Sequence, residues 1–140
     1  MCHQPFRRRF APSNHRSQCR MGYRARMIQL ISYLKRKPGT THAEFLEYWH
    51  NNHGPLIRNS SAAKYVRRYE QHASVWPEPG SRMPEPEWDG VTIQWFDSAQ
   101  SFYDHMKEDD FPAMMEDTDK FLDMTKTQFV ITEEPTIVIS

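Results

Sequence analysis

Hydrophobic and β-branched residues gather in four short runs from residue 27 onward, and turn residues bound each run. This pattern is typical of β-strands. The predicted strands span residues 27–34, 64–76, 91–96 and 128–132. We expect residues 136–139, which follow Pro135, to continue the pairing of the last strand. The segment 77–86 holds four prolines, which cannot donate hydrogen bonds to a sheet, and it therefore predicts a loop.

Two further regions show the three- and four-residue spacing of amphipathic helices. Thr41, with Glu44 three residues later, matches the capping-box pattern at the start of a helix. Apolar residues continue at helical spacing as far as Gly54 and Pro55, which we expect to end or kink this helix. Ser98 is a good cap for the second region, which consists of two helical pieces before the last strand.

The predicted elements follow the order strand, helix, strand, strand, helix, strand (βαββαβ). This is the ferredoxin-like α+β arrangement with an antiparallel four-stranded sheet. A chain of 140 residues has room for one domain. Helices on one face leave the other face of the sheet uncovered, and a large apolar face usually marks an interface. We therefore expect a homodimer whose sheets pack face to face, with a partly apolar cavity for a small ligand in each subunit.

Charge is divided unevenly along the chain. The 18 basic and 18 acidic residues cancel, yet residues 1–26 hold seven arginines and no acidic residue, which leaves a net charge of −7 on residues 27–140. The tail lacks hydrophobic periodicity, so we expect it to be disordered and the folded domain to span residues 27–140. It fits an organelle-import presequence, an upstream extension from a misassigned start, or an electrostatic arm for a partner.

Composition disfavours several classes of protein. No stretch approaches the ~20 consecutive apolar residues of a transmembrane helix. The balanced overall charge disfavours a nucleic-acid binder, which normally carries an excess of basic residues. We therefore expect neither a membrane nor a nucleic-acid partner, and a cytoplasmic location unless the tail directs import into an organelle.

The sequence offers no evident site for a metal or a cofactor. Its two cysteines, Cys2 and Cys19, precede the predicted domain, so neither a disulfide framework nor a Cys-rich zinc site holds it together. His50 and His53 have the spacing of a metal-binding pair, but no nearby Asp or Cys completes the set. No Gly-rich phosphate loop or nucleophile elbow is present. We expect a protein without metal or cofactor.

His53 and His72 are the candidate catalytic residues. His53 lies at the end of the first predicted helix, where an imidazole can act as a general acid or base near neutral pH. The alternative is that His53 caps helix carbonyl groups beside Gly54. His72 lies on the second predicted strand and faces either the cavity or the solvent.

Aromatic side chains are the candidates for contact with a ligand, because their faces and hydroxyl groups suit a planar molecule. The candidate substrate-binding residues are Tyr33, Tyr48, Tyr69 and Trp95. Trp49 points about 100° away from Tyr48 around the same helix, and its spacing fits a packing role better.

Short motifs follow one another along the domain in a defined order. The first is Leu34-Lys-Arg-Lys-Pro-Gly39, followed by Glu44-Phe-x-x-Tyr48-Trp49-x-x-x-His53-Gly-Pro-Leu56. The later ones are Arg68-Tyr-x-x-His72, Asp89-Gly-Val91 leading to Trp95-Phe-Asp97, and Phe121-Leu-Asp123 with Glu133-Glu134. Together they resemble the EthD-domain family of the dimeric α+β barrel superfamily, over residues 27–140. The resemblance implies the homodimeric barrel that the pattern also predicts.

The resemblance also bears on function. Family members resemble accessory proteins of the oxidative degradation of ethers and other xenobiotics, and relatives include dehydratases, decarboxylases and cyclases of aromatic polyketides. The first hypothesis is therefore a cofactor-independent lyase or cyclase of secondary metabolism, which moves protons on a small aromatic or polyketide-type substrate. The alternatives are a non-catalytic accessory protein that binds a hydrophobic ligand for an oxygenase system, and a monooxygenase-type oxidoreductase, cofactor-free or haem-dependent.

Overall fold

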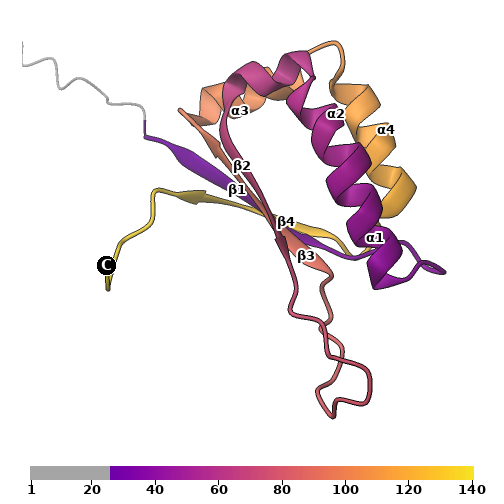
Figure 1. Cartoon of the computed structure of the whole chain (residues 1–140). Coiled ribbons are helices and arrows are strands. Elements are labelled where there is room, and N and C mark those ends of the chain that lie inside the picture. Colours follow the sequence, from indigo (N-terminus) through magenta and orange to yellow (C-terminus); the bar gives the residue numbers. More distant parts are fainter. Residues whose placement is uncertain (1–25) are drawn as a thin grey trace, which may run out of the picture.

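The computed structural model describes residues 26–140, and the features expected of residues 1–25 lie outside this range. A four-stranded antiparallel sheet in the order β2-β3-β1-β4 stands beside a layer of helices (Figure 1). The strands are β1 (Ile28–Leu34), β2 (Val66–Ala73), β3 (Gly90–Phe96) and β4 (Gln128–Glu133). The α-helices are α1 (His42–Tyr48), α2 (Gly54–Arg58), α3 (Ala99–Met106) and α4 (Phe111–Phe121). The predicted ferredoxin-like α+β fold is confirmed.

The first helical region begins as predicted and ends differently. The Glu44 backbone N–H donates to Thr41 Oγ1 at 3.1 Å, and the Thr41 N–H donates to Glu44 Oε2 at 2.8 Å, so the capping box is complete. Gly54 and Pro55, expected to end or kink the helix, instead begin α2 after a π-helical turn, η1 (Trp49–His53). Proline has no N–H for the usual helical hydrogen bond. The helix accommodates it by widening, and the Gly54 N–H donates to the Trp49 carbonyl.

The sheet carries a β-bulge that decides which side chains of β2 face the helices. The pairing of β2 with β3 shifts by one residue between Val66 and Arg68. Successive side chains of a strand point to opposite faces, so a one-residue shift exchanges the two faces for the rest of β2. Tyr69 pairs with Gln94 on the helix-covered face, and His72 lies on the other face.

The core lies between α1, η1, α4 and the sheet. Its buried cluster contains Leu34, Phe45, Trp49, Phe121 and Leu122. Phe45 contacts both neighbouring rings, with centroid distances of 5.1 Å to Trp49 and 5.9 Å to Phe121. Trp49 also packs on Gly90, where an added Cβ would lie 2.8 Å from the indole ring. A glycine at position 90 therefore leaves room for the indole ring against β3.

The proline-rich segment between β2 and β3 is a loop, as predicted, and it is anchored at its base. The Trp76 ring stacks on His42 at a centroid distance of 3.8 Å. Asp89 is fully buried and accepts hydrogen bonds from the backbone N–H of Arg36 at 2.9 Å, from Arg36 Nη1 at 2.7 Å and from His42 Nδ1 at 2.9 Å. These contacts attach both ends of the loop to the start of α1.

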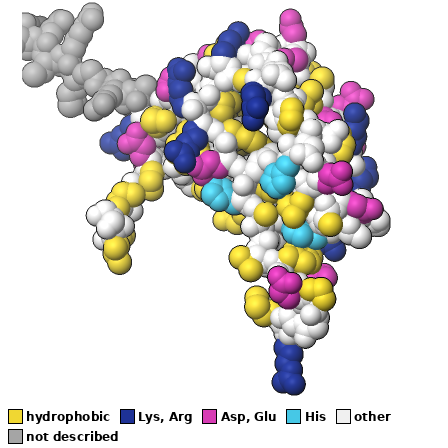
Figure 2. All heavy atoms as spheres, in the orientation of Figure 1, with side chains coloured by type: hydrophobic (Ala, Val, Ile, Leu, Met, Phe, Trp, Pro, Cys, Tyr) yellow, Lys and Arg dark blue, Asp and Glu magenta, His cyan; other side chains and the backbone are white. Residues whose placement is uncertain are grey.

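Two predicted strand boundaries are wrong. The second strand is shorter than residues 64–76, because residues Ser61–Tyr65 form a 3₁₀ turn, η2, before it begins. Residues 136–139 do not continue the pairing of β4, because Pro135 interrupts the strand and β4 is at the edge of the sheet. The C-terminal segment instead projects from the body of the molecule with hydrophobic side chains exposed (Figures 1 and 2).

Candidate active site

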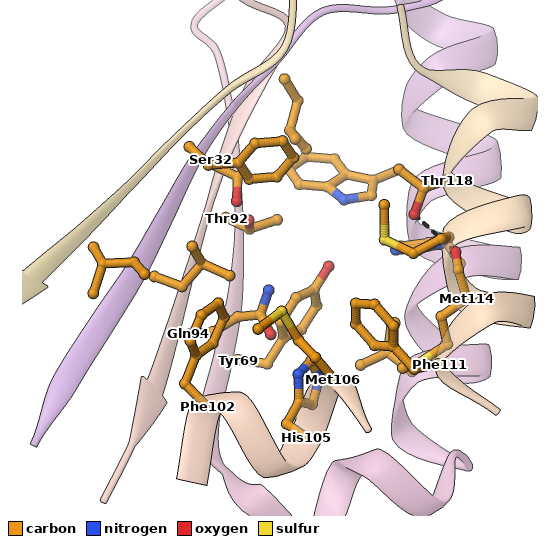
Figure 3. A pocket seen from close by; sticks show the side chains of 18 of the residues that line it. Ser32, Tyr69, Thr92, Gln94, Phe102, His105, Met106, Phe111, Met114 and Thr118 are labelled. Atoms are coloured by element: carbon orange, nitrogen blue, oxygen red, sulfur yellow. Dashed lines mark hydrogen bonds between the residues drawn. The ribbon is translucent and has the colours of Figure 1, made fainter. Parts of the chain in front are cut away.

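A pocket of about 560 Å³ lies between the sheet and the helices (Figure 3). Most of its wall is apolar and comes from α3, α4 and the strands. The lining includes Leu30, Leu34, Ile57, Phe102, Met106, Phe111, Met114, Met115, Phe121, Phe129 and Ile131. The polar side chains of the wall are few, as is usual in small-molecule sites. They are Ser32, His53, Tyr69, Thr92, Gln94, His105 and Thr118.

His53 is held in this wall by an acidic partner from another helix. Its Nδ1 lies 2.8 Å from Oδ2 of Asp117, which is in the middle of α4. Both side chains are nearly buried, with about a tenth of each side chain exposed. The other carboxylate oxygen, Oδ1, accepts a hydrogen bond of 2.5 Å from the Tyr48 hydroxyl. A carboxylate is an acceptor only, so it holds the imidazole tautomer that has its proton on Nδ1.

The environment favours neutral His53 and ionised Asp117. Burial lowers the pKa of His53, and the hydrogen bond to Asp117 only partly opposes this effect. Burial alone would raise the pKa of Asp117, but hydrogen bonds from Tyr48 and His53 outweigh it and hold that pKa below its usual value. The hydrogen bond to Asp117 raises the pKa of Tyr48 to about 12, so the hydroxyl keeps its proton.

The second imidazole nitrogen of His53 is available for chemistry. Within residues 26–140, Nε2 makes no hydrogen bond, and it is not among the fully enclosed polar atoms. Because the ring lines the pocket, we place Nε2 at the pocket surface. A neutral imidazole with its proton on Nδ1 has a lone pair on Nε2. The arrangement therefore offers a proton acceptor to a molecule in the pocket.

The π-helical turn carries two residues of the pocket wall. Trp49 and His53 are the first and last residues of η1, and both line the pocket. Single π-helical turns inside α-helices are common at functional sites. Here the turn directly precedes Pro55; the Trp49 ring packs on Gly90 of β3, and the His53 ring contacts Asp117 and Phe121 of α4.

The four candidate ligand-binding residues lie in three different parts of the structure. Tyr69 lines the pocket, and its hydroxyl points into it (Figure 3). The Tyr48 hydroxyl is instead occupied by Asp117 behind the pocket wall. Tyr33 and Trp95 are on the sheet face without helices, where Tyr33 packs near Trp88 and Trp95 lies beneath Arg68.

His72 is not brought to the pocket. The bulge in β2 places it on the same outer face as Trp95, and its Nε2 lies 2.7 Å from Glu70 Oε2. Its side chain is about half exposed. The sequence alone did not determine whether the His72 side chain faces the cavity or the solvent. The register of β2 with β3 places it on the outer face of the sheet.

Two residues of the site were not among the candidates. Asp117 shares the buried stripe of α4 with Met114 and Phe121, and an acidic residue within an apolar stripe is a signal that the sequence does contain. His105 is buried on α3, lines the pocket and has no partner for its Nδ1 among the described residues. Burial lowers the pKa of His105, which favours the neutral ring.

The described part of the chain contains neither a cluster of metal-ligating side chains nor a membrane-spanning element. Within residues 26–140, no three His, Cys, Asp or Glu side chains are arranged to hold a metal ion. His50 is turned toward Gln71, with Nδ1 2.7 Å from the amide oxygen, and does not join His53. No helix in this range is both long and apolar enough to cross a membrane.

Fold and site together define a ferredoxin-like α+β protein with a largely apolar pocket of a size suited to a small molecule. The EthD domain profile matches residues 37–125, which is more than half of the chain, and the protein belongs to the EthD-domain family. This result confirms the resemblance seen in the sequence motifs.

Solved structures support the same fold. An ethyl tert-butyl ether D (EthD) family protein from Bacillus halodurans C-125 is 26% identical with a TM-score of 0.60, over 78% of this chain and 99% of that one. A hydroxynitrile lyase from Passiflora edulis is 9% identical with a TM-score of 0.60, and the match covers 81% of this chain and 98% of the lyase. SnoaB, a cofactor-independent oxygenase from Streptomyces nogalater, is 9% identical with a TM-score of 0.53, and the match covers 83% of this chain and 100% of the oxygenase.

Other matching structures are described as dimeric proteins with a ferredoxin-like fold. A comparison with curated protein sequences gave no significant match. The likeness to the lyase and the oxygenase is below 25% identity and concerns the fold. What this chain does must be argued from its own pocket.

Proposed function

We propose that this protein is a cofactor-independent enzyme that moves protons on a small aromatic or polyketide-type substrate. The observation that carries the proposal is the pair formed by His53 and Asp117 in the wall of an apolar pocket. The reaction class is dehydration, cyclisation or decarboxylation, in which one proton is removed at one atom and delivered to another.

His53 is the proton-transfer group in this proposal. Its Nε2 takes a proton from an acidic carbon or hydroxyl group of the substrate, and the imidazole becomes positively charged. The nearby Asp117 carboxylate stabilises that charge, because the two groups are 2.8 Å apart and both side chains are nearly buried. The imidazolium then returns the proton to the product or the leaving group.

Asp117 and Tyr48 are positioning residues. The carboxylate sets the tautomer of His53, and the Tyr48 hydroxyl fixes the carboxylate from its other oxygen. This chain of contacts connects α1, η1 and α4. His72 has no part in it, because it lies on the other face of the sheet.

We also propose a homodimer formed through the helix-free face of the sheet. That face carries Ile31, Tyr33, Val91, Ile93 and Trp95, which are only partly buried in the single chain. Covering an apolar surface is favourable by about 25 cal/mol per Å². The dimeric assembly described for structures of the same fold supports this arrangement.

Proton exchange is the experiment that tests the enzymatic proposal. 2-Tetralone, a bicyclic enolisable ketone, is incubated with the protein in D₂O, and mass spectrometry follows the replacement of its acidic C–H hydrogens by deuterium. Wild-type protein should accelerate exchange, and His53→Gln should reduce the acceleration by about 10²–10⁴-fold. His72→Gln is the matched control and should exchange at the wild-type rate.

Two results would contradict the proposal. Equal exchange rates in wild type and His53→Gln would exclude His53 as the base. Binding of 2-tetralone without any acceleration of exchange would favour the non-catalytic accessory protein, for which an apolar pocket is sufficient.

A further inference from the structure

His105, in the last turn of α3, is a buried histidine whose surroundings are apolar. Only 7% of the residue is exposed, and its Nδ1 is fully enclosed without a partner among the described residues. Three phenylalanine rings contact the imidazole, with centroid distances of 5.2 Å to Phe96, 5.3 Å to Phe111 and 6.4 Å to Phe102. A buried polar group without a partner is costly, and a phenylalanine would suit this place better. Packing alone therefore does not explain a histidine here.

Two carboxylates act on His105 without binding it. Asp110 and Glu108 raise its pKa through their charge alone, and burial outweighs them, so the pKa of His105 is lowered. Both carboxylates instead accept hydrogen bonds from Ser61, and Glu108 also pairs with Lys64 at 2.8 Å. His105 is therefore neutral near pH 7 and is not held by an acidic partner of the kind that Asp117 provides for His53.

The enclosed Nδ1 determines which nitrogen of the neutral His105 ring carries the proton. A proton on Nδ1 would be a buried N–H without an acceptor, which is the rarer kind of unpaired polar group in proteins. The proton therefore resides on Nε2. Within residues 26–140 this nitrogen has no hydrogen-bond partner, but it is not among the fully enclosed atoms. Because the ring lines the pocket, we place the Nε2–H at the pocket surface (Figure 3).

His105 and His53 contact opposite ends of α4. The His105 ring packs on Phe111, the first residue of that helix, and the His53 ring packs on Phe121, the last residue, at a centroid distance of 4.9 Å. These two phenylalanines are about 15 Å apart along the helix axis, from the rise per residue of an α-helix. The pocket thus has a proton acceptor, His53 Nε2, near one end and a hydrogen-bond donor, His105 Nε2–H, near the other.

We propose that the Nε2–H of His105 binds an oxygen atom of the ligand, which carries this oxygen on the far side of its ring system from the group that His53 deprotonates. The inference rests on the proposed function and narrows its substrate class to compounds with two functional groups at opposite edges. A neutral imidazole donates this hydrogen bond without the cost of burying a charge. When His53 Nε2 takes the proton of a conjugated ligand, the electron pair left behind is delocalised toward the bound oxygen, and the N–H stabilises the negative charge.

The test uses two ligands of nearly equal shape, 6-hydroxy-2-tetralone and 6-methyl-2-tetralone. Both have acidic C–H hydrogens beside the ketone, and only the first has an oxygen at the opposite edge. Calorimetry measures the ratio of their two affinities. His105→Phe should lower the preference for the hydroxy compound about 10-fold, the size of one hydrogen bond between neutral groups. His72→Phe makes the same substitution on the other face of the sheet and should leave the ratio unchanged.

A second measurement observes His105 in the wild-type protein, so the test does not depend on how well a variant folds. ¹⁵N NMR at pH 7 should show a proton on Nε2 of His105 and none on Nδ1. 6-Hydroxy-2-tetralone should move the Nε2–H signal downfield, and 6-methyl-2-tetralone should move it less. The methionine methyl signals of Met106, Met114 and Met115 report the entry of either ligand into the pocket.

The outcomes separate this inference from the proposed function. An unchanged affinity ratio in His105→Phe, or a proton on Nδ1 in place of Nε2, overturns the inference and leaves the role of His53 intact. If the ratio falls as expected while His53→Gln still exchanges 2-tetralone at the wild-type rate, the proposed function fails and His105 remains a ligand-binding residue. If neither ligand moves the methionine signals, the pocket does not admit a molecule of this class, and the inference is contradicted.

Discussion

The His53 imidazole on the π-helical turn and the Asp117 carboxylate on α4 are 2.8 Å apart, although 64 positions separate them in the sequence. This contact joins the two helical regions of the fold at the wall of the pocket. It also determines the proton positions on His53, because the carboxylate accepts the Nδ1 proton and leaves Nε2 for a ligand.

Asp117→Asn should lower the pKa of His53 further. In the wild type, burial lowers this pKa and the carboxylate opposes the effect, so removal of the negative charge leaves burial unopposed. Titration of the His53 ring by NMR measures the change. Asp119→Asn, an exposed position on the same helix, is the control. An unchanged or raised pKa in Asp117→Asn would contradict the assigned electrostatics.

Stability should fall as the pH is lowered from about 7 toward 5. Both His53 and His105 have lowered pKa values in the folded protein, so the unfolded chain binds protons first as the pH drops through its ordinary histidine pKa of about 6.5. Melting temperatures between pH 5 and pH 8 test this. His105→Gln should flatten the dependence, and His72→Gln, which changes an exposed ring, should not.

Tyr48→Phe should destabilise the protein by about 1–2 kcal/mol, because it removes a hydrogen bond to an ionised carboxylate that is nearly buried. Urea unfolding measures the free energy. Tyr103→Phe, whose ring is half exposed, should change it by less than about 0.5 kcal/mol. Equal effects of the two substitutions would mean that the hydrogen bond to Asp117 adds nothing to the free energy of unfolding.

Gly90→Ala should destabilise the protein by about 1–3 kcal/mol, since the new methyl group would lie 2.8 Å from the Trp49 ring. The penalty should shrink when Gly90→Ala is introduced into Trp49→Phe, whose smaller ring leaves room. Additive effects in the double variant would show that the indole is not the group that requires a glycine.

Ile31→Lys should convert the proposed dimer into a monomer, because it places a charge in the middle of the helix-free sheet face. Light scattering at micromolar concentration measures the mass. Wild-type protein with a monomeric mass would contradict the proposed assembly, whatever the variant does.

The sequence was sufficient to predict those features of the fold whose signal lies within a few residues. The Thr41 and Glu44 capping box and the Ser98 cap lie within four residues of the helices they start, and the structure confirms both. The order of the elements along the chain was also predicted from pattern, and it indicated the ferredoxin-like class that the structure confirms. The π-helical turn was missed, since proline was expected to end or kink the helix rather than widen it.

The site depended on contacts that sequence pattern does not encode. Tyr69 and His72 are both on β2, and a single bulge decides that Tyr69 faces the pocket and His72 does not. Asp117 could be suspected from its place in an apolar stripe, but its pairing with His53 is a long-range contact. Tyr48 likewise was expected at the ligand, and its hydroxyl is bound to Asp117 instead.

The most direct test of the account is the protonation of the two ring nitrogens of His53, observed by ¹⁵N NMR at pH 7 and assigned by its loss in His53→Gln. We expect a protonated Nδ1 and an unprotonated Nε2, and a change in the Nε2 signal when 2-tetralone is added. A proton on Nε2 with Nδ1 free, or an Nε2 signal that stays constant while the ligand fills the pocket, would contradict the proposed role of His53 as the base.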